Sequence, residues 1–280
     1  MAQIVELHQR GVFLEGLPDE VCRDVTALCH LVTSRVTDAV LALGLWEEAW
    51  GAMWSQLEAD RQIRQGAWER DRQAERDREA QLAAENPPPT GEWWSPERRE
   101  WEDDIRERAR RDVLRAKWGS GQLPEEYRRR LPTLHARSFV LALAQIERAL
   151  RVMAQLDTGG AKAAVTAAYE DFKAGLPTIV DVRDSIEHAE DRMRSLGKRE
   201  RRLTLQPIEN SMISAPGGGV LVGDSLNGRM YGSTVADGSY VEVEISDASV
   251  EIARAAVQRV LDTLPWRDQG HGFMHWTPHS

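Results

Sequence analysis

Apolar residues recur at spacings of three and four along most of this 280-residue chain, and that spacing constrains it to a mainly helical fold. Two stretches carry the pattern most strongly, Val21–Leu45 and Ser138–Leu156. The second also holds small residues, Ala142, Ala144 and Ala149, which allow neighbouring helices to approach closely. We therefore expect Ser138–Leu156 to be the central helix of the core.

The chain changes character after Leu57. Between Leu57 and Glu85 acidic and basic residues alternate and apolar residues are sparse, which is typical of a solvated helix with ion pairs between successive turns. Consecutive prolines at 87–89 then exclude a helix. Ser95-Pro96 suits the start of a second charged helix that runs to about Trp118. Residues 57–118 are therefore expected to form a charged helical hairpin arm.

Three tryptophans, Trp46, Trp50 and Trp54, recur at every fourth position just before this arm. On a helix they would lie along one face. Such a face is typical of a core or an oligomer interface, and a ligand-binding platform is the alternative.

The periodicity changes from helical to alternating after about residue 202, and Asn227-Gly228 and Asp237-Gly238 are strong hairpin-turn signals. We predict a small antiparallel β-insertion at about 202–245, followed by a final helix. The resulting organisation is an N-terminal helical region with its arm at 1–118, a linker at 119–132, a helical domain at 133–266 and a flexible tail at 267–280.

Composition restricts the partners that the chain can have. Its net charge of −9 is unlike that of a general nucleic-acid binder, so any RNA chemistry must use a local basic patch. No apolar run approaches the roughly 18 residues of a membrane span, and the N-terminus does not have the pattern of a secretory signal. Cys22 and Cys29 do not imply a disulfide framework. We expect a cytoplasmic protein that is not associated with a membrane.

The candidate chemistry lies in Thr178–Gly197, whose apolar spacing predicts one helix that ends near Gly197. Arg183, Asp184 and His188 lie beside its apolar stripe. The pattern Arg183-Asp184-x-x-x-His188 resembles the Rx4–6H motif of the HEPN family, and the order of the predicted elements extends the resemblance over about residues 133–266.

The resemblance implies a helical-bundle fold and a metal-independent endoribonuclease, of a kind found in toxin and defence systems. In that chemistry the 2′-hydroxyl of the RNA attacks the adjacent phosphate. His188 would be the general acid and base, Arg183 the phosphate clamp and Asp184 an orienting group. No cofactor and no metal are expected.

Arg183 and His188 are roughly 140° apart around an ideal helix, so one helix does not aim both side chains at one phosphate. The resemblance resolves this by dimerisation, which places two motif helices face to face. We therefore expect a homodimer with RNA as its partner. Four cations just after the helix form the expected RNA-binding patch: Lys198, Arg199, Arg201 and Arg202.

Two alternatives remain open. Arg183 with Glu187, and Asp184 with His188, are spaced as ordinary surface ion pairs, so the motif could be structural. The chain could also be a non-catalytic helical interaction or assembly protein. It would then bind a protein partner or itself through the Trp46/Trp50/Trp54 face and the arm at 57–118.

Overall fold

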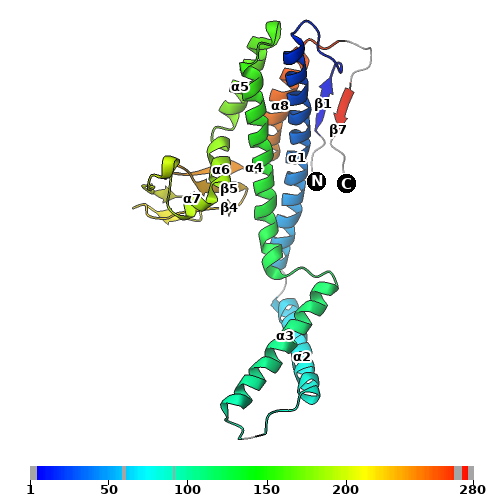
Figure 1. Ribbon diagram of the computed structural model, residues 1–280, viewed down its shortest axis with the longest axis vertical. Helices are drawn as coiled ribbons and strands as arrows, with labels where there is room; N and C mark the ends of the chain where they lie inside the picture. Colours follow the sequence, from blue (N-terminus) through cyan, green and yellow to red (C-terminus); the bar gives the residue numbers. More distant parts are fainter. Residues whose placement is uncertain (1–4, 59–60, 91, 268–272, 277–280) are drawn as a thin grey trace. The chain divides into compact units, whose positions relative to one another are not determined.

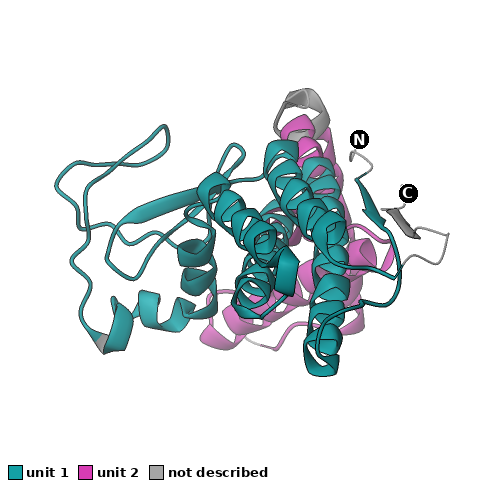
Figure 2. Ribbon diagram, turned by 90° about the horizontal axis from the view of Figure 1, so that it is seen from above, with its two compact units in different colours: residues 1–49, 131–280 teal, residues 50–130 magenta. Residues whose placement is uncertain are grey.

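The computed structural model describes residues 5–58, 61–90, 92–267 and 273–276. The fold is mainly helical with a small antiparallel sheet, as the helical spacing and the alternating segment predict (Figure 1). The chain forms two compact units, residues 1–49 with 131–280 and residues 50–130 (Figure 2). Two long helices, α1 and α4, each contribute to both units.

The first unit contains most of the elements. In chain order they are β1 (Glu6–Gln9), α1 (Asp19–Glu58, up to residue 49), α4 (Glu125–Gln155, from residue 131), the short 3-10 helix η1 (Gly159–Ala161), α5 (Lys162–Gly175), α6 (Ile179–Glu187), α7 (Ala189–Met193), the 3-10 helix η2 (Lys198–Glu200), β2 (Ile208–Glu209), β3 (Ser214–Ala215), β4 (Ser225–Asn227), β5 (Met230–Thr234), β6 (Tyr240–Glu244), α8 (Asp247–Thr263) and β7 (Phe273–Trp276).

Helix α4 is at the centre of the core of this unit. Its buried residues confirm the central helix predicted at 138–156. Phe139, Leu143, Ile146 and Leu150 are fully buried on α4. Helix α5 packs against α8, and a Cβ atom at Gly175 would lie 2.8 Å from Ile252 Cγ2. The absence of a side chain at this glycine therefore permits the close approach of the two helices.

The domain boundaries expected from the sequence need correction. The first 49 residues belong to the same compact unit as residues 131–280 and are not part of a separate N-terminal region. The physical reason is the apolar stripe of α1, because Val25, Val32 and Val36 are buried in that unit. The alternation of acidic and basic residues that begins near residue 57 lies close to the start of the other unit, at Trp50.

The small sheet positions the candidate site. Strands β4, β5 and β6 are antiparallel in that order, with Leu226 opposite Tyr231 and Tyr231 opposite Val243. The two turns occur at the sequence signals, since Gly228 and Gly238 have φ of 58° and 89°. Helix α6 packs on β5 and β6. The hydroxyl of Ser185 in α6 donates to the carbonyl of Thr234 in β5 at 2.5 Å.

The second unit is built around an antiparallel hairpin of α2 (Arg61–Glu85) and α3 (Pro96–Gly119). Its small core is Leu82, Ile105 and Ala109, with Trp101 packed against it. Ion pairs join the two helices, with Arg78 Nη2 at 2.7 Å from Asp112 Oδ2 and Lys117 paired with Asp71. Ser95 caps α3 as expected, because its side chain accepts from the backbone N–H of Arg98.

The three tryptophans expected on one face have different environments. Trp46 is 1% exposed, whereas Trp54 is 46% exposed. The guanidinium of Arg229 lies 5.1 Å from the centroid of the Trp46 ring. Trp46 therefore belongs to the core of the first unit and cannot be part of an exposed docking face, which is a correction to the proposed Trp46/Trp50/Trp54 surface.

Two features bear on membrane association and on the cysteines. Among the described residues, one helical stretch, Asp19–Ser55, is long and apolar enough to cross a membrane, and 44% of its most apolar window is buried within the protein. The core helix of a soluble protein passes the same test. Cys29, on this helix, is buried, and burial raises the pKa of its thiol to about 12, so it is a poor nucleophile.

The C-terminal segment 267–280, expected as a flexible tail, contributes β7, which pairs with β1 in antiparallel register. Glu6 lies opposite Trp276 and Gln9 lies opposite Phe273. His271 and His279, which belong to the same tail, lie outside the described residues. This two-stranded pairing brings the two ends of the described chain together (Figure 1).

Replacing Trp46 with Ala should lower the free energy of unfolding by about 3–5 kcal/mol, because it empties a large buried volume. The matched control, Trp54→Ala, should change stability by about 0.5 kcal/mol or less, since that ring is already exposed. Urea denaturation of both variants measures the difference. Equal losses in the two variants would contradict the burial of Trp46.

Candidate functional site

The motif segment is not the single helix that the apolar spacing predicts. Helix α6 ends at Glu187, and His188 has φ −116° and ψ 39° before α7 begins at Ala189. Beyond the break, Arg192 in α7 is buried, with its Nη1 donating to the carbonyl of Leu196 at 2.5 Å. The prediction of one helix over Thr178–Gly197 is therefore wrong, and the axis changes at the candidate catalytic histidine.

The end of α7 is also displaced from the position predicted at Gly197. Ser195 adopts the left-handed conformation, with φ 58°. The N–H of Leu196 donates to the carbonyl of Asp191 at 2.8 Å. The N–H of Ser195 donates to the carbonyl of Arg192 at 2.8 Å. These two bonds are the Schellman pattern of a helix C-terminus. They turn the chain sharply into the segment of the four predicted cations.

Arg183 is held by acidic neighbours on its own helix. Its side chain is 13% exposed, its Nη2 lies 2.8 Å from Asp184 Oδ1 and its Nε lies 3.7 Å from Glu187 Oε2. It lines a cavity of about 230 Å³ between α1, α4 and α6. The other lining residues are Leu31, Leu141, Ala144, Gln145, Arg148 and Glu187.

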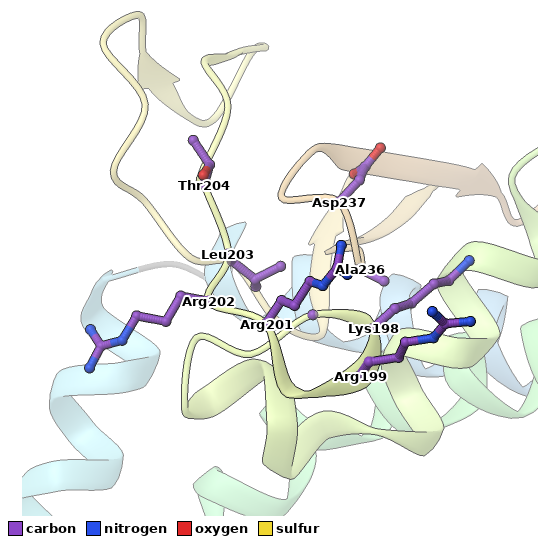
Figure 3. Close-up of a pocket in the computed structure, with 9 residues that line it drawn as sticks. Lys198, Arg199, Arg201, Arg202, Leu203, Thr204, Ala236 and Asp237 are labelled. Carbon is purple, nitrogen blue, oxygen red and sulfur yellow. The ribbon is translucent and has the colours of Figure 1, made fainter.

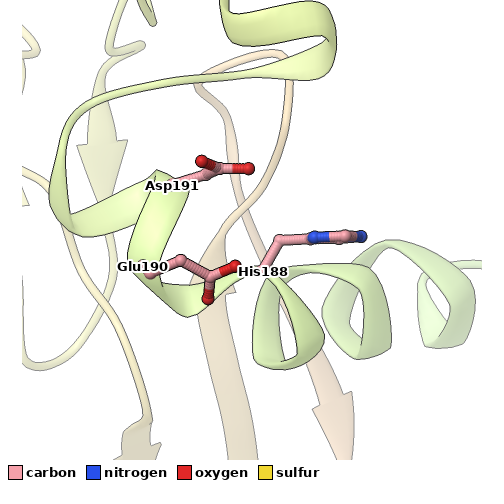
Figure 4. A group of neighbouring side chains, drawn as sticks. All are labelled: His188, Glu190 and Asp191. Carbon is pink, nitrogen blue, oxygen red and sulfur yellow. The ribbon is translucent and has the colours of Figure 1, made fainter.

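His188 lies in a different environment. It is exposed at the break between α6 and α7, and its ring forms a group with the carboxylates of Glu190 and Asp191 (Figure 4). One ligand atom from each of the three lies within 4.8 Å of the others. An imidazole and two carboxylates suit a divalent cation, but such exposed clusters are common on protein surfaces and this one carries no assignment.

The structure does not bring Arg183 and His188 into one cavity. Arg183 lines the cavity between α1, α4 and α6, and His188 is not among the residues of that lining. Asp184, expected as an orienting group, is paired with Arg183. Within one protomer the three motif residues therefore form an anchored ion pair and a separate exposed imidazole.

All four predicted cations lie in the lining of one cavity. Lys198, Arg199, Arg201 and Arg202 line a cavity of about 440 Å³, which we call the basic cavity. Its other lining residues are Gly197, Leu203, Thr204, Ala236 and Asp237. Figure 3 shows the side chains of Lys198, Arg199 and Arg201 on one side of the loop, whereas the Arg202 side chain extends to the other.

The described side chains around the basic cavity neutralise its charge only in part. Among the side chains that the structure describes, none of the four cations has a carboxylate oxygen within 4.0 Å, whereas Arg35, Arg78 and Arg183 are each paired with a carboxylate. The one acid in the lining, Asp237, accepts hydrogen bonds from the hydroxyl and the N–H of Ser239 at 2.6 and 2.8 Å. These bonds, with a smaller contribution from Lys198, hold the pKa of Asp237 below its usual value. The cavity therefore carries excess positive charge.

Long-range packing supplies the wall that the sequence could not predict. Ala236 and Asp237 come from the turn between β5 and β6, and the N–H of Gln206 donates to the carbonyl of Gly238 at 3.0 Å. Gly197 fits against the carbonyl of Ala236, where a Cβ atom would collide. The run of cations and the Asp237-Gly238 turn were each visible in the sequence, but no local pattern indicated that the two lie together.

A scan of protein-family models and searches of curated proteins and of solved structures find no match to this chain. The site must therefore be interpreted from its own geometry and charge.

Replacing Ser195 with Gly should stabilise the protein by about 0.5–1 kcal/mol. The left-handed conformation costs a residue with a Cβ atom roughly 1–2 kcal/mol, which exceeds the roughly 0.5–1 kcal/mol of added chain entropy at a glycine. Ser195→Ala is the control, because it keeps the Cβ atom and should bring no gain. Chemical denaturation compares them, and a glycine variant no more stable than the alanine variant would contradict this geometry.

Proposed function

We propose that this chain binds a single strand of RNA at the basic cavity and cleaves it without a metal, by the chemistry that the HEPN resemblance implies. The observation that supports the proposal best is the excess positive charge of the basic cavity in a chain of net charge −9. All four cations are exposed, so an anion in solution can reach them. A phosphodiester backbone is the anion that fits a run of Lys and Arg side chains.

His188 is the residue proposed to move protons. Along the chain, α7 and the turn at Ser195 separate His188 from the cations of the basic cavity. The imidazole is exposed and therefore accessible to a strand. A neutral imidazole takes the proton of the 2′-hydroxyl as that oxygen attacks phosphorus. A protonated imidazole gives a proton to the departing 5′-oxygen. The products are a 2′,3′-cyclic phosphate and a 5′-hydroxyl.

Arg183 is proposed as the phosphate clamp, although two carboxylates now occupy its guanidinium. To hold a phosphate it would exchange Glu187, the more distant partner at 3.7 Å, and keep Asp184 at 2.8 Å. Asp184 then orients the guanidinium of Arg183. A homodimer would supply a second motif segment, and this is the arrangement we propose for cleavage in the cytoplasm by a toxin or defence protein.

The test is cleavage of a labelled single-stranded RNA by the purified chain in the presence of a chelator. His188→Ala should lower the rate by a factor of about 10²–10⁴, the usual contribution of a general acid or base. Arg183→Ala should also abolish cleavage. His30→Ala is the matched control, since His30 is an exposed histidine on α1, and it should cut at the wild-type rate.

Thermal unfolding of the same variants separates chemistry from folding. His188→Ala should unfold at the wild-type temperature, because the side chain is exposed. If the wild type cuts no RNA, or if His188→Ala cuts as fast as His30→Ala, the proposed activity is wrong.

A second function, assembly, is favoured by the tryptophans of the α2–α3 hairpin. Trp68, Trp93, Trp94 and Trp118 are all exposed, and Trp93 is 78% exposed. The rings of Trp93 and Trp94 are in edge-to-face contact with centroids 5.5 Å apart, shortly after the prolines at 87–89. Exposed aromatic clusters of this kind are enriched at protein–protein contacts. We propose the hairpin as the element through which the chain binds itself or a protein partner.

Replacing both Trp93 and Trp94 with Ser should lower the molar mass of the assembly measured by light scattering after size exclusion. The matched control, Trp54→Ser, removes another exposed ring and should leave the mass unchanged. The Arg183 and His188 variants should also leave the molar mass unchanged if assembly does not depend on the motif. An unchanged mass in the Trp93/Trp94 double variant would argue against the hairpin as the assembly element.

A further inference from the structure

We infer that the basic cavity binds the sugar–phosphate backbone without reading the bases, so that single-stranded DNA occupies it as well as RNA does. This inference rests on the proposed function and assigns its substrate class. It locates selectivity for RNA in the chemical step, where a 2′-hydroxyl is required, and not in binding.

The lining of the basic cavity has the groups for a backbone and not for a base. Sequence-specific recognition of a single strand stacks its bases on aromatic rings. The nine lining residues include no Phe, Tyr, Trp or His and no Asn or Gln. Their uncharged members are small or aliphatic, except for Thr204. A base entering this cavity would meet arginine guanidinium planes, on which every base can stack, but no aromatic ring and no amide that reads its edge.

One residue of the cavity wall has an unusual backbone conformation. Arg199 has φ 57° and ψ 40°, in the left-handed region. A non-glycine residue is held in this conformation only when its surroundings enforce it, and such residues cluster at binding sites.

The sugar has little to contact. Thr204 carries the one hydroxyl among the lining side chains, and it is exposed. A single peripheral hydroxyl does not make a cavity selective for the 2′-hydroxyl of ribose. Deoxyribose strands of the same length should therefore bind with the same affinity and compete with RNA.

The cations determine how binding depends on salt. Three of them, Lys198, Arg199 and Arg201, project to the same side of the loop in Figure 3. Each phosphate neutralised on a single strand contributes about −0.7 to the slope of log K against log salt concentration, so three contacts predict a slope of roughly −2. The acidic remainder of the protein opposes binding only weakly beyond the screening length of roughly 8 Å at physiological salt.

The experiment measures fluorescence anisotropy of labelled twelve-residue strands over a series of salt concentrations. The wild-type chain is titrated with oligo(dT) and oligo(dC), which cannot be cleaved by 2′-hydroxyl attack. The full-length His188→Ala variant is titrated with oligo(U) and oligo(C). We expect dissociation constants that agree within about twofold across the four strands and a slope of roughly −2.

Variants of the cavity identify the site. Lys198→Ala, Arg201→Ala and Arg199→Gly should each make the slope shallower by about 0.7. Glycine is used at position 199 because it suits the positive φ of the native residue. The control is Arg194→Ala, which removes an equal charge from an exposed arginine that is paired with Asp191 and lies outside the lining. It should leave the slope unchanged.

The outcomes separate this inference from cleavage. A base preference above tenfold, failure of DNA to bind, or a slope that the cavity variants leave unchanged would overturn the inference, even if RNA is cut. Conversely, oligo(dT) that binds with the predicted slope while the wild type cuts no RNA would uphold the inference and reject the proposed ribonuclease activity. Inhibition of RNA cleavage by oligo(dT) would support both.

Discussion

The attachment of α6 to the small sheet is the interaction on which the candidate site depends. The buried hydroxyl of Ser185 donates to the carbonyl of Thr234, and the hydroxyl of Thr178 donates to that of Glu242 at 2.6 Å. These two bonds fix α6 on β5 and β6 from its first turn to its last. Because α7 and η2 follow directly, the same attachment brings the cations at 198–202 against the turn between β5 and β6.

This attachment also explains why the motif residues separate. With α6 fixed on the sheet, Arg183 faces the α1 and α4 side and lies among Asp184, Glu187 and the cavity between these helices. The chain then breaks at His188, which leaves the imidazole exposed. Arg183, held in its ion pair, and the separate imidazole of His188 can contact the same phosphate only if a second motif segment or a bound strand brings the two groups together. That requirement is why the proposed cleavage includes a homodimer, whereas strand binding at the basic cavity requires one protomer.

The sequence predicted those features that local patterns determine. Helical spacing identified the core helix at 138–156, the Asn-Gly and Asp-Gly pairs identified both turns of the sheet, and the run of cations identified the basic cavity. Features set by long-range contact were not predictable. The cavity wall at Ala236 depends on sheet geometry, and the different exposures of Trp46 and Trp54 depend on which unit surrounds each ring. The helical spacing of α6 and α7 is the same whether or not the axis bends between them.

The central claim is that a nucleic-acid strand lies in the basic cavity, within reach of His188. The most direct measurement is side-chain NMR of the full-length chain while oligo(dT) is added at low salt. We predict that the guanidinium resonances of Arg199 and Arg201 and the imidazole resonances of His188 shift together and saturate, whereas those of Arg194 and His30 do not move. Shifts spread evenly over the arginines of the chain, or no shift at Arg199 and Arg201, would contradict the account.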